Sequence, residues 1–468
     1  MNGGFVRCCC LCALVAATVT TDTDELCAAA ATATELFQKI LPPPPRVPFN
    51  ASEGFVPSLV DGARPVVVIN SPVLQWPALH ASSPLAWTPA AFARAHAAAN
   101  RTLRAHVSAA RITQMHSAVS PLGALPDIGW LRPYEEATYE PAEFMRRASA
   151  GEHLIVFAPL KELPLALRGG IGDVVSLSVP WRRVLEVNAW VAGAGQATPA
   201  HYDVSGNMYV QVHGKKRFVL FPPTATRYLY LFPKIHPADR STQVDFDASL
   251  EEIQESFFDF DPEEWVEDGV VTVDLVPGEV LYIPPYWFHH VAPVGPIGAE
   301  DELSISVSIA LDSEQIELRE LLRANAPPIA RGASLHVRDA ALRALLSELL
   351  GNRAVRFTRE LIRTRWSHAG ADVGRPRVAA RLAPALRSAT QEFERELRGS
   401  VVSVGDATRR ELRDFASNVH GALRSRIYEF TPAELDIELG NYIEDCVAHT
   451  LNATQVGAFL RRFARLGE

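Results

Sequence analysis

The spacing of hydrophobic positions changes along this chain and divides it into regions. Between residues 180 and 311, short apolar runs rich in β-branched and aromatic residues alternate with Gly and Pro turns. This pattern predicts a mainly β domain, either a barrel or a double sheet. The expected strand segments are 183–192, 207–212, 216–223, 270–276, 279–285 and 303–311.

The flanking regions show other patterns. Residues 50–165 mix strand signals at 65–69 and 153–157 with a helix start at Thr88, which can cap the first turn. From Ser313 onward the pattern is helical, with a capping box at Thr431. Leucines lie on one helical stripe at positions 342, 345, 346, 349 and 350. We therefore expect a β domain over 48–312 and a helical C-terminal region over 313–468.

The first 20 residues are typical of a secretory signal peptide. One basic residue, Arg7, precedes an apolar run from Cys8 to Val19. The run is shorter than the ~20 apolar residues that a membrane span needs, so we expect no stable membrane insertion. Residues 21–47 are rich in Ala, Thr and Pro and predict a stiff linker. The predicted location is the secretory pathway, either the ER lumen or outside the cell. A disordered or palmitoylated tail is the alternative interpretation.

The cysteines suit that location, but whether they form a disulfide stays open. Removal of residues 1–20 would leave only Cys27 and Cys446. In an oxidising compartment these two could form one disulfide, or both could stay as thiols. Glycosylation triplets begin at Asn50, Asn100 and Asn452, which suits the same compartment.

Composition and charge narrow the function classes. The chain has 468 residues, 48% of them hydrophobic and 21% charged, which is typical of a globular protein. Its net charge of -9 argues against a general nucleic-acid binder, which needs a basic face. Lysine is scarce and arginine is common, so the pair Lys215 and Lys216 stands out.

One short motif predicts a metal site. In the segment TPAHYD, His201 and Asp203 are two residues apart, so on a strand they would point to the same face. A third ligand could come from VPGEVLYIPPYWFHHV, where His289 and His290 follow a strand and a double proline. Two histidines and one carboxylate on one face form the triad of non-haem Fe(II) oxygenases. The residues alone do not choose between the two histidines.

The longer context of this motif resembles a known family. The stretch NAWVAGAGQATPAHYD (188–203), followed by NMYVQVHGKKRFVLFPP and later by PGEVLYIPPYWFHHV, is similar to the JmjC family of oxygenases, in the small branch that includes asparaginyl hydroxylases. The resemblance covers residues 55–312. It implies a double-stranded β-helix, or cupin jelly roll, with flanking helices. It also implies a dioxygenase that uses Fe(II), 2-oxoglutarate and O2 to hydroxylate a protein side chain, with release of succinate and CO2.

The resemblance assigns roles to individual residues. It implies that His201, Asp203 and His289 bind the iron. Lys216 matches the lysine that pairs with the distal carboxylate of 2-oxoglutarate, and Thr198 matches its hydrogen-bond partner. The other positions implied near the co-substrate are Asn207 and Ser308. A hairpin-surface lysine is the alternative interpretation of Lys216, and Lys215 is expected to be solvated.

Some positions depart from the family pattern. Ser308 and Ala310 stand where the branch has Asn and Trp, and Ile155 stands where some relatives have a tyrosine. These changes alter the expected shape of the pocket. The polar segment 231–247 is either a substrate-contacting loop or a structural crossover.

Two other function classes remain open. One is a catalytically inactive JmjC-like binding module in the secretory pathway, which the intact motif and Lys216 disfavour. The other is an oxygenase acting on a small molecule or an RNA base, of which the acidic charge disfavours RNA. A histone demethylase is disfavoured because no chromatin-reading domain or nuclear signal is visible. The C-terminal helices are expected to frame a protein substrate or to form a homodimer.

Overall fold

The computed structural model describes residues 41–50, 64–108, 111, 119–120, 123–124, 134–172, 184–236, 238–257, 260–261, 265, 267–299, 303–366, 391–398, 404–425 and 430–465. The predicted signal peptide, most of the predicted linker and Cys27 lie outside these residues. Its possible partner Cys446 is a buried thiol.

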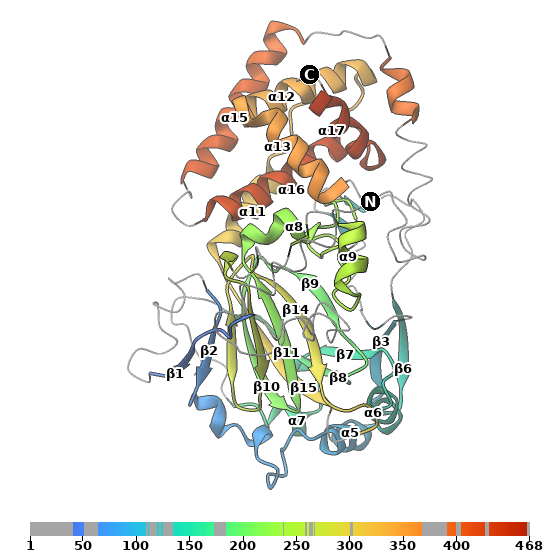
Figure 1. The fold of residues 1–468 in the computed structure, drawn as a ribbon, viewed down its shortest axis with the longest axis vertical. Coiled ribbons are helices and arrows are strands. Elements are labelled where there is room, and N and C mark those ends of the chain that lie inside the picture. The colour runs from blue at the N-terminus through green and yellow to red at the C-terminus, as the bar shows by residue number, and fades with distance from the viewer. Residues whose placement is uncertain are drawn as a thin grey trace, which may run out of the picture.

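Two large sheets form the β domain (Figure 1). The nine-stranded sheet has the order β1 (Arg46–Pro48), β2 (Val66–Ile69), β13 (Val280–Ile283), β10 (Gly206–His213), β15 (Ser304–Leu311), β8 (Val184–Ala192), β7 (Leu154–Pro159), β3 (Leu103–Ser108) and β6 (Tyr134–Tyr139). The four-stranded sheet has the order β12 (Val271–Leu275), β11 (Lys215–Phe221), β14 (Phe288–Val294) and β9 (Thr198–His201). β4 (Val119–Ser120) and β5 (Gly123–Ala124) pair in a separate two-stranded sheet.

Side chains alternate between the two faces along each strand, so each face of the nine-stranded sheet has its own hydrophobic core. On β10, Met208 and Val210 join the cluster on its outer face, whereas Tyr209 points between the two sheets. There it packs edge to face on Phe218 of β11, with ring centroids 5.0 Å apart. This two-residue period is the one that the sequence predicts, and it gives the jelly-roll core of a cupin fold.

Tight turns connect the strands that carry the site. Gly214 joins β10 to β11 with a φ of 64°, and Gly278 joins β12 to β13 with a φ of 89°. Side-chain-bearing residues rarely adopt this left-handed conformation, which explains glycine at both turns. The Gly214 turn places Lys216 at the second position of β11.

Helices lie at both ends of the β domain (Figure 1). The helices at the end away from the C-terminal region are α5 (Pro89–Ala98), α6 (Pro141–Ser149) and α7 (Leu165–Arg168). Between β11 and β12 lie α8 (Thr226–Leu229) and α9 (Leu250–Ser256). The C-terminal region contains α11 (Glu314–Ala324), α12 (Leu335–Leu350), α13 (Ala354–Leu361), a π-helical turn at Ile362–Trp366, α15 (Asp406–Ser425), α16 (Pro432–Thr450) and α17 (Val456–Arg465).

The predicted helix caps are confirmed. The Thr88 side chain accepts a hydrogen bond from the N–H of Ala91 at the start of α5. At the start of α16, Thr431 and Glu434 form a reciprocal capping box. Within the described residues, every helix is too short or too polar to span a lipid bilayer.

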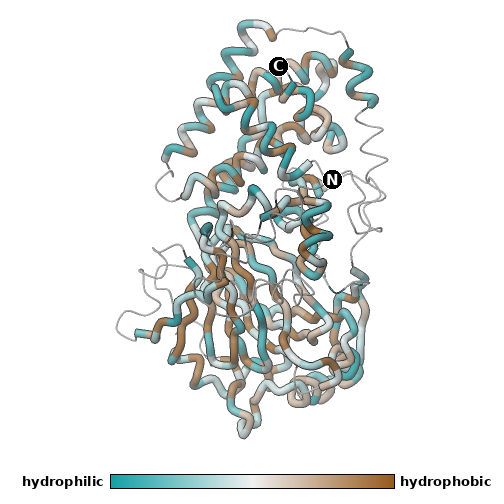
Figure 2. Tube along the Cα trace, in the orientation of Figure 1, coloured by the Kyte–Doolittle hydropathy of each residue, from teal (hydrophilic) through white to brown (hydrophobic). Residues whose placement is uncertain are grey.

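The C-terminal helices share a hydrophobic core with the four-stranded sheet. One cluster joins Tyr202, Phe221 and Phe288 from the β domain to Leu346 of α12 and Ile443 of α16. Figure 2 shows apolar residues running through the strands and into the helices above them. The expected boundary near residue 312 stays a prediction, and the core continues across it.

Because this core is continuous, we expect the two regions to unfold together. Leu346→Ala should lower the free energy of unfolding by about 2–5 kcal/mol, since it leaves a cavity in the shared cluster. Urea unfolding followed by tryptophan fluorescence and by far-UV circular dichroism should give one coincident transition. Two separate transitions, with only one shifted by the substitution, would show that the regions are independent.

Candidate metal centre

The pairing of β9 with β14 brings the first two candidate ligands together. His201 lies directly opposite His289 in this antiparallel pair. Their rings are close, with centroids 4.1 Å apart. The two histidines are 88 positions apart in the sequence, so only the fold makes them neighbours.

Asp203 completes the cluster from a position that differs from the predicted one. The sequence pattern placed it on the strand, but β9 ends at His201, and Asp203 lies in the segment that follows. Its carbonyl oxygen accepts a hydrogen bond of 2.8 Å from the N–H of Tyr286. One ligand atom from each of the three residues lies within 4.8 Å of the others. The Oδ2 atom of Asp203 is 3.9 Å from Nε2 of His289.

Backbone carbonyls orient both imidazole rings. Nδ1 of His201 lies 2.9 Å from the carbonyl oxygen of Pro199, and Nδ1 of His289 lies 3.1 Å from that of Trp287. A carbonyl only accepts, so each Nδ1 carries the proton and each Nε2 keeps its lone pair. Metal-binding histidines are commonly held in this way.

Two side chains hold the Asp203 carboxylate. Asn207 donates a hydrogen bond of 3.1 Å to Oδ2, and Arg240 donates one of 3.1 Å to Oδ1. Arg240 comes from the segment 231–247 and has a φ of 70°, a conformation that is costly for a residue with a side chain. The contact of Arg240 with Asp203 was not predicted, because no sequence pattern pairs the two segments.

The protonation states suit a bound cation. Burial lowers the pKa of His201, and burial together with His201 lowers that of His289 to about 3. Burial by itself raises the pKa of Asp203, but His201, His289 and Arg240 outweigh it and the net pKa is lowered. At neutral pH the site therefore offers two neutral imidazoles and one carboxylate.

The geometry distinguishes the two adjacent histidines. His289 belongs to the three-residue cluster, whereas the His290 ring lies 5.5 Å from that of Phe246 in the core behind the four-stranded sheet. Successive residues of a strand point to opposite faces, which explains the difference.

Lys216 lies buried between the sheets with neutral partners. Its ammonium donates to the hydroxyl of Tyr209 at 2.7 Å and to that of Ser306 at 2.9 Å. Within the described part of the chain, no carboxylate forms an ion pair with it. Burial lowers its pKa to about 7. Lys215 is exposed, as expected.

The other predicted co-substrate residues lie nearby in different settings. Thr198 begins β9, paired with Val291 of β14. Ser308 is buried on β15 and accepts a hydrogen bond of 2.8 Å from the indole N–H of Trp190. Tyr209 and Ser306, the direct partners of Lys216, were not predicted from the sequence. They lie two residues from Asn207 and Ser308 respectively, so strand alternation could have revealed them.

A row of aromatic rings leads away from Lys216 across the nine-stranded sheet. The ammonium lies 6.0 Å from the ring centre of Trp190, which stacks on Phe157 at 5.1 Å. Phe157 packs against His106 at 5.4 Å, and His106 stacks on Tyr134 at 4.1 Å. Phe157 is 37% exposed, so this member of the row reaches the protein surface.

Comparison with known families agrees with this architecture. The model of the Cupin-like domain family matches residues 52–310, more than half of the chain. The chain belongs to this family. The family includes JmjC domains, whose members are Fe(II)- and 2-oxoglutarate-dependent oxygenases.

Individual relatives match about a quarter to a third of this chain. HSPB1-associated protein 1 of Homo sapiens is 31% identical over 138 residues, which are 29% of this chain and 26% of that protein. tRNA wybutosine-synthesizing protein 4 of Gibberella zeae is 30% identical over 178 residues, 36% of this chain and 16% of that protein. Jumonji C domain-containing protein 5 of Drosophila melanogaster is 34% identical over 115 residues, 24% of this chain and 26% of that protein. The matched part thus spans about a quarter or less of each relative.

The residues present fit the family's metal and co-substrate. Two Nε2 atoms and one carboxylate, turned toward one another, are a donor set for Fe(II). A buried ammonium without a carboxylate partner in the described chain suits the distal carboxylate of 2-oxoglutarate.

The adjacent histidines provide a matched test of the metal site. His289→Ala should weaken Co(II) binding by about 100-fold or more, because it removes a ligand. The Kd of His290→Asn for Co(II) should be within a few-fold of that of the unsubstituted protein, since the His290 ring faces the core behind the four-stranded sheet. Titration followed by Co(II) absorption measures both. Loss of binding in His290→Asn with retention in His289→Ala would contradict the assignment.

Proposed function

We propose that the protein is an Fe(II)- and 2-oxoglutarate-dependent dioxygenase that hydroxylates a protein side chain. The observation that carries the proposal is a three-residue metal site in the same barrel as a buried, uncompensated lysine. When bound, iron with 2-oxoglutarate and O2 would supply oxidative decarboxylation and insertion of an oxygen atom into a C–H bond. The protein substrate and the secretory location are parts of this proposal.

The chain's own residues would bind and orient these groups. His201, Asp203 and His289 would hold the iron on one face, leaving the opposite face for 2-oxoglutarate and O2. Asn207 and Arg240 would keep the carboxylate in place. Such preorganised positioning is what this chemistry requires of the protein.

Lys216 would bind the distal carboxylate of the co-substrate. Its partners Tyr209 and Ser306 are neutral, so the ammonium keeps its capacity to pair with an anion. Phe157, which stacks on Trp190 and is partly exposed, is an aromatic residue that a substrate chain could contact. The net charge of -9 favours a protein substrate over RNA, because a negatively charged protein repels phosphates.

The pKa of Lys216 makes co-substrate affinity depend on pH. The anion binds the protonated amine, and in the free protein this form is lost as pH rises through about 7. We therefore expect the Kd of 2-oxoglutarate, measured with Mn(II) in place of iron, to rise by up to about tenfold per pH unit above 7. Calorimetry in buffers of different ionisation enthalpy should show uptake of about one proton at pH 8.

Lys215 is the control for this measurement. Lys216→Met should weaken 2-oxoglutarate binding by at least about 100-fold, as expected for the loss of a buried charged partner. Lys215→Met should leave the affinity unchanged, because this side chain is exposed. A pH-independent affinity that survives Lys216→Met would place the co-substrate elsewhere.

Turnover is tested with the iron-loaded protein and 2-oxoglutarate in air, in the presence of a peptide library. The expected result is succinate formation together with one or more peptides that gain the mass of one oxygen atom. Asp203→Ala should abolish both signals. Metal and 2-oxoglutarate binding without any succinate would favour the inactive binding module, whereas oxygen gain on a small molecule or RNA base alone would overturn the protein-hydroxylase assignment.

A further inference from the structure

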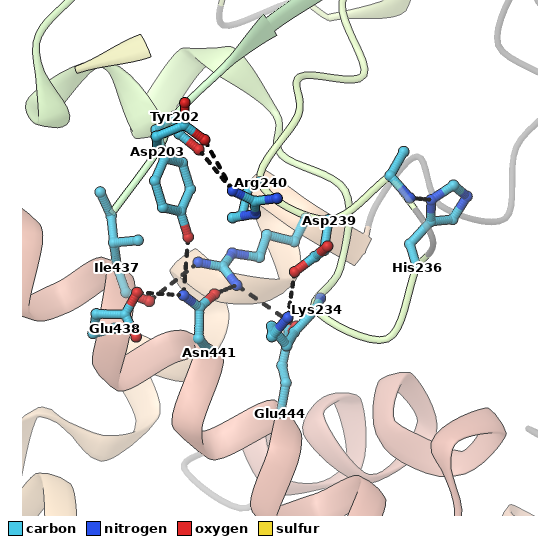
Figure 3. A network of polar contacts seen from close by, with 12 residues as sticks. Tyr202, Asp203, Lys234, His236, Asp239, Arg240, Ile437, Glu438, Asn441 and Glu444 are labelled. Atoms are coloured by element: carbon cyan, nitrogen blue, oxygen red, sulfur yellow. Dashed lines mark hydrogen bonds and ion pairs between the residues drawn. The ribbon is translucent and has the colours of Figure 1, made fainter. Parts of the chain in front are cut away.

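Helix α16 carries buried polar side chains toward the β domain. Glu438, Asn441 and Glu444 recur along one side of this helix, and all three are buried, with Glu444 fully inaccessible. Buried carboxylates and amides are costly unless they have partners, so their contacts need an explanation. Figure 3 shows these contacts reaching the segment that carries the metal ligands.

The first connection runs through Tyr202, which stands between the ligands His201 and Asp203. Its side chain points away from the metal cluster and is fully buried. The side-chain amide of Asn441 donates a hydrogen bond of 3.0 Å to the Tyr202 hydroxyl. A residue of α16 therefore holds the residue that links two metal ligands.

The second connection runs through the segment 231–247. Glu444 accepts a hydrogen bond from the backbone N–H of Lys234, whose ammonium pairs with Asp239. Asp239 directly precedes Arg240, and Arg240 donates to Asp203. The first connection thus ends at Tyr202 and the second at the adjacent ligand Asp203 (Figure 3).

The α16 side chains are themselves held in place. Arg365 donates a hydrogen bond of 2.9 Å to Oδ1 of Asn441, and Trp366 donates one of 2.8 Å to Glu444. Asn441 also donates to Glu438 at 3.1 Å. With its polar atoms all engaged, the Asn441 amide has one orientation available and can act as a rigid support.

We propose that Asn441 is a positioning residue of the metal site, and that the functional unit extends through α16, beyond the family match that ends at residue 310. The inference rests on the proposed function, because it concerns the same metal site. Metal ligands must stay within about 0.5 Å of their productive positions. A hydrogen bond that holds the backbone between two ligands therefore contributes to metal affinity as well as to stability.

The test uses the full-length protein and Co(II) as the metal. Tyr202→Phe and Asn441→Leu each remove the connecting hydrogen bond from one side. Each should raise the Co(II) Kd by roughly fivefold, less than the ~10- to 100-fold typical of a group that bonds a ligand directly. If both substitutions act through this one hydrogen bond, the double variant should bind Co(II) no more weakly than the single variant with the lower affinity.

Tyr442→Phe is the control on the same helix. The Tyr442 hydroxyl donates a hydrogen bond of 2.8 Å to the carbonyl of Asn325, away from the metal site. Tyr442→Phe should lower the urea midpoint about as much as Tyr202→Phe does, while its Co(II) affinity stays within about twofold of that of the unsubstituted protein. Tyr202→Phe keeps the shape of the ring, so a folded variant is expected even if Asn441→Leu unfolds.

The outcomes separate this inference from the proposed function. Wild-type Co(II) affinity in folded Tyr202→Phe, with only its stability reduced, would overturn the positioning role and leave the metal site intact. Equal loss of affinity in Tyr442→Phe would also overturn it, since the effect would then follow general destabilisation. Failure of the unsubstituted protein to bind Co(II) would overturn the metal site and the inference together.

Discussion

The antiparallel pairing of β9 with β14 is the contact on which the rest of the site depends. It sets His201 opposite His289, and the carbonyl two residues before each histidine orients its ring, from Pro199 within β9 and from Trp287 just before β14. The end of β9 then allows the chain to turn Asp203 toward the pair, held by the Tyr286 N–H. A slip of one residue would turn these side chains to the other face and remove the cluster.

Burial creates an electrostatic imbalance that a ligand would correct. The histidines are kept neutral, the carboxylate is kept ionised, and Lys216 has only neutral partners. The buried ammonium of Lys216 is costly for the protein alone and becomes favourable when an anion binds, whereas the neutral imidazoles and the carboxylate are in the protonation states that a bound cation needs. Because the Asp203 carboxylate is partly buried and ionised, it needs the hydrogen bonds that Asn207 and Arg240 donate to it.

The strands and the candidate ligands could be predicted because they depend on local patterns. Alternation of apolar residues marked β8, β10, β11 and β15, and the spacing of His201 and Asp203 suggested a shared metal. Alternation also implied opposite directions for Lys215 and Lys216. The contacts of Arg240 and Asn441 could not be predicted, since they join segments 37 and 239 positions apart whose packing has no sequence pattern. The end of β9 before Asp203 depends equally on a distant partner, Tyr286.

Anaerobic titration of the full-length protein with Fe(II) and 2-oxoglutarate is the most direct test of the central claim. We expect a weak visible charge-transfer band in the unsubstituted protein and none in His201→Ala, because the band requires co-substrate chelated to iron on the three ligands. Equal bands in both proteins, or bound iron without a band, would contradict the assignment of this site.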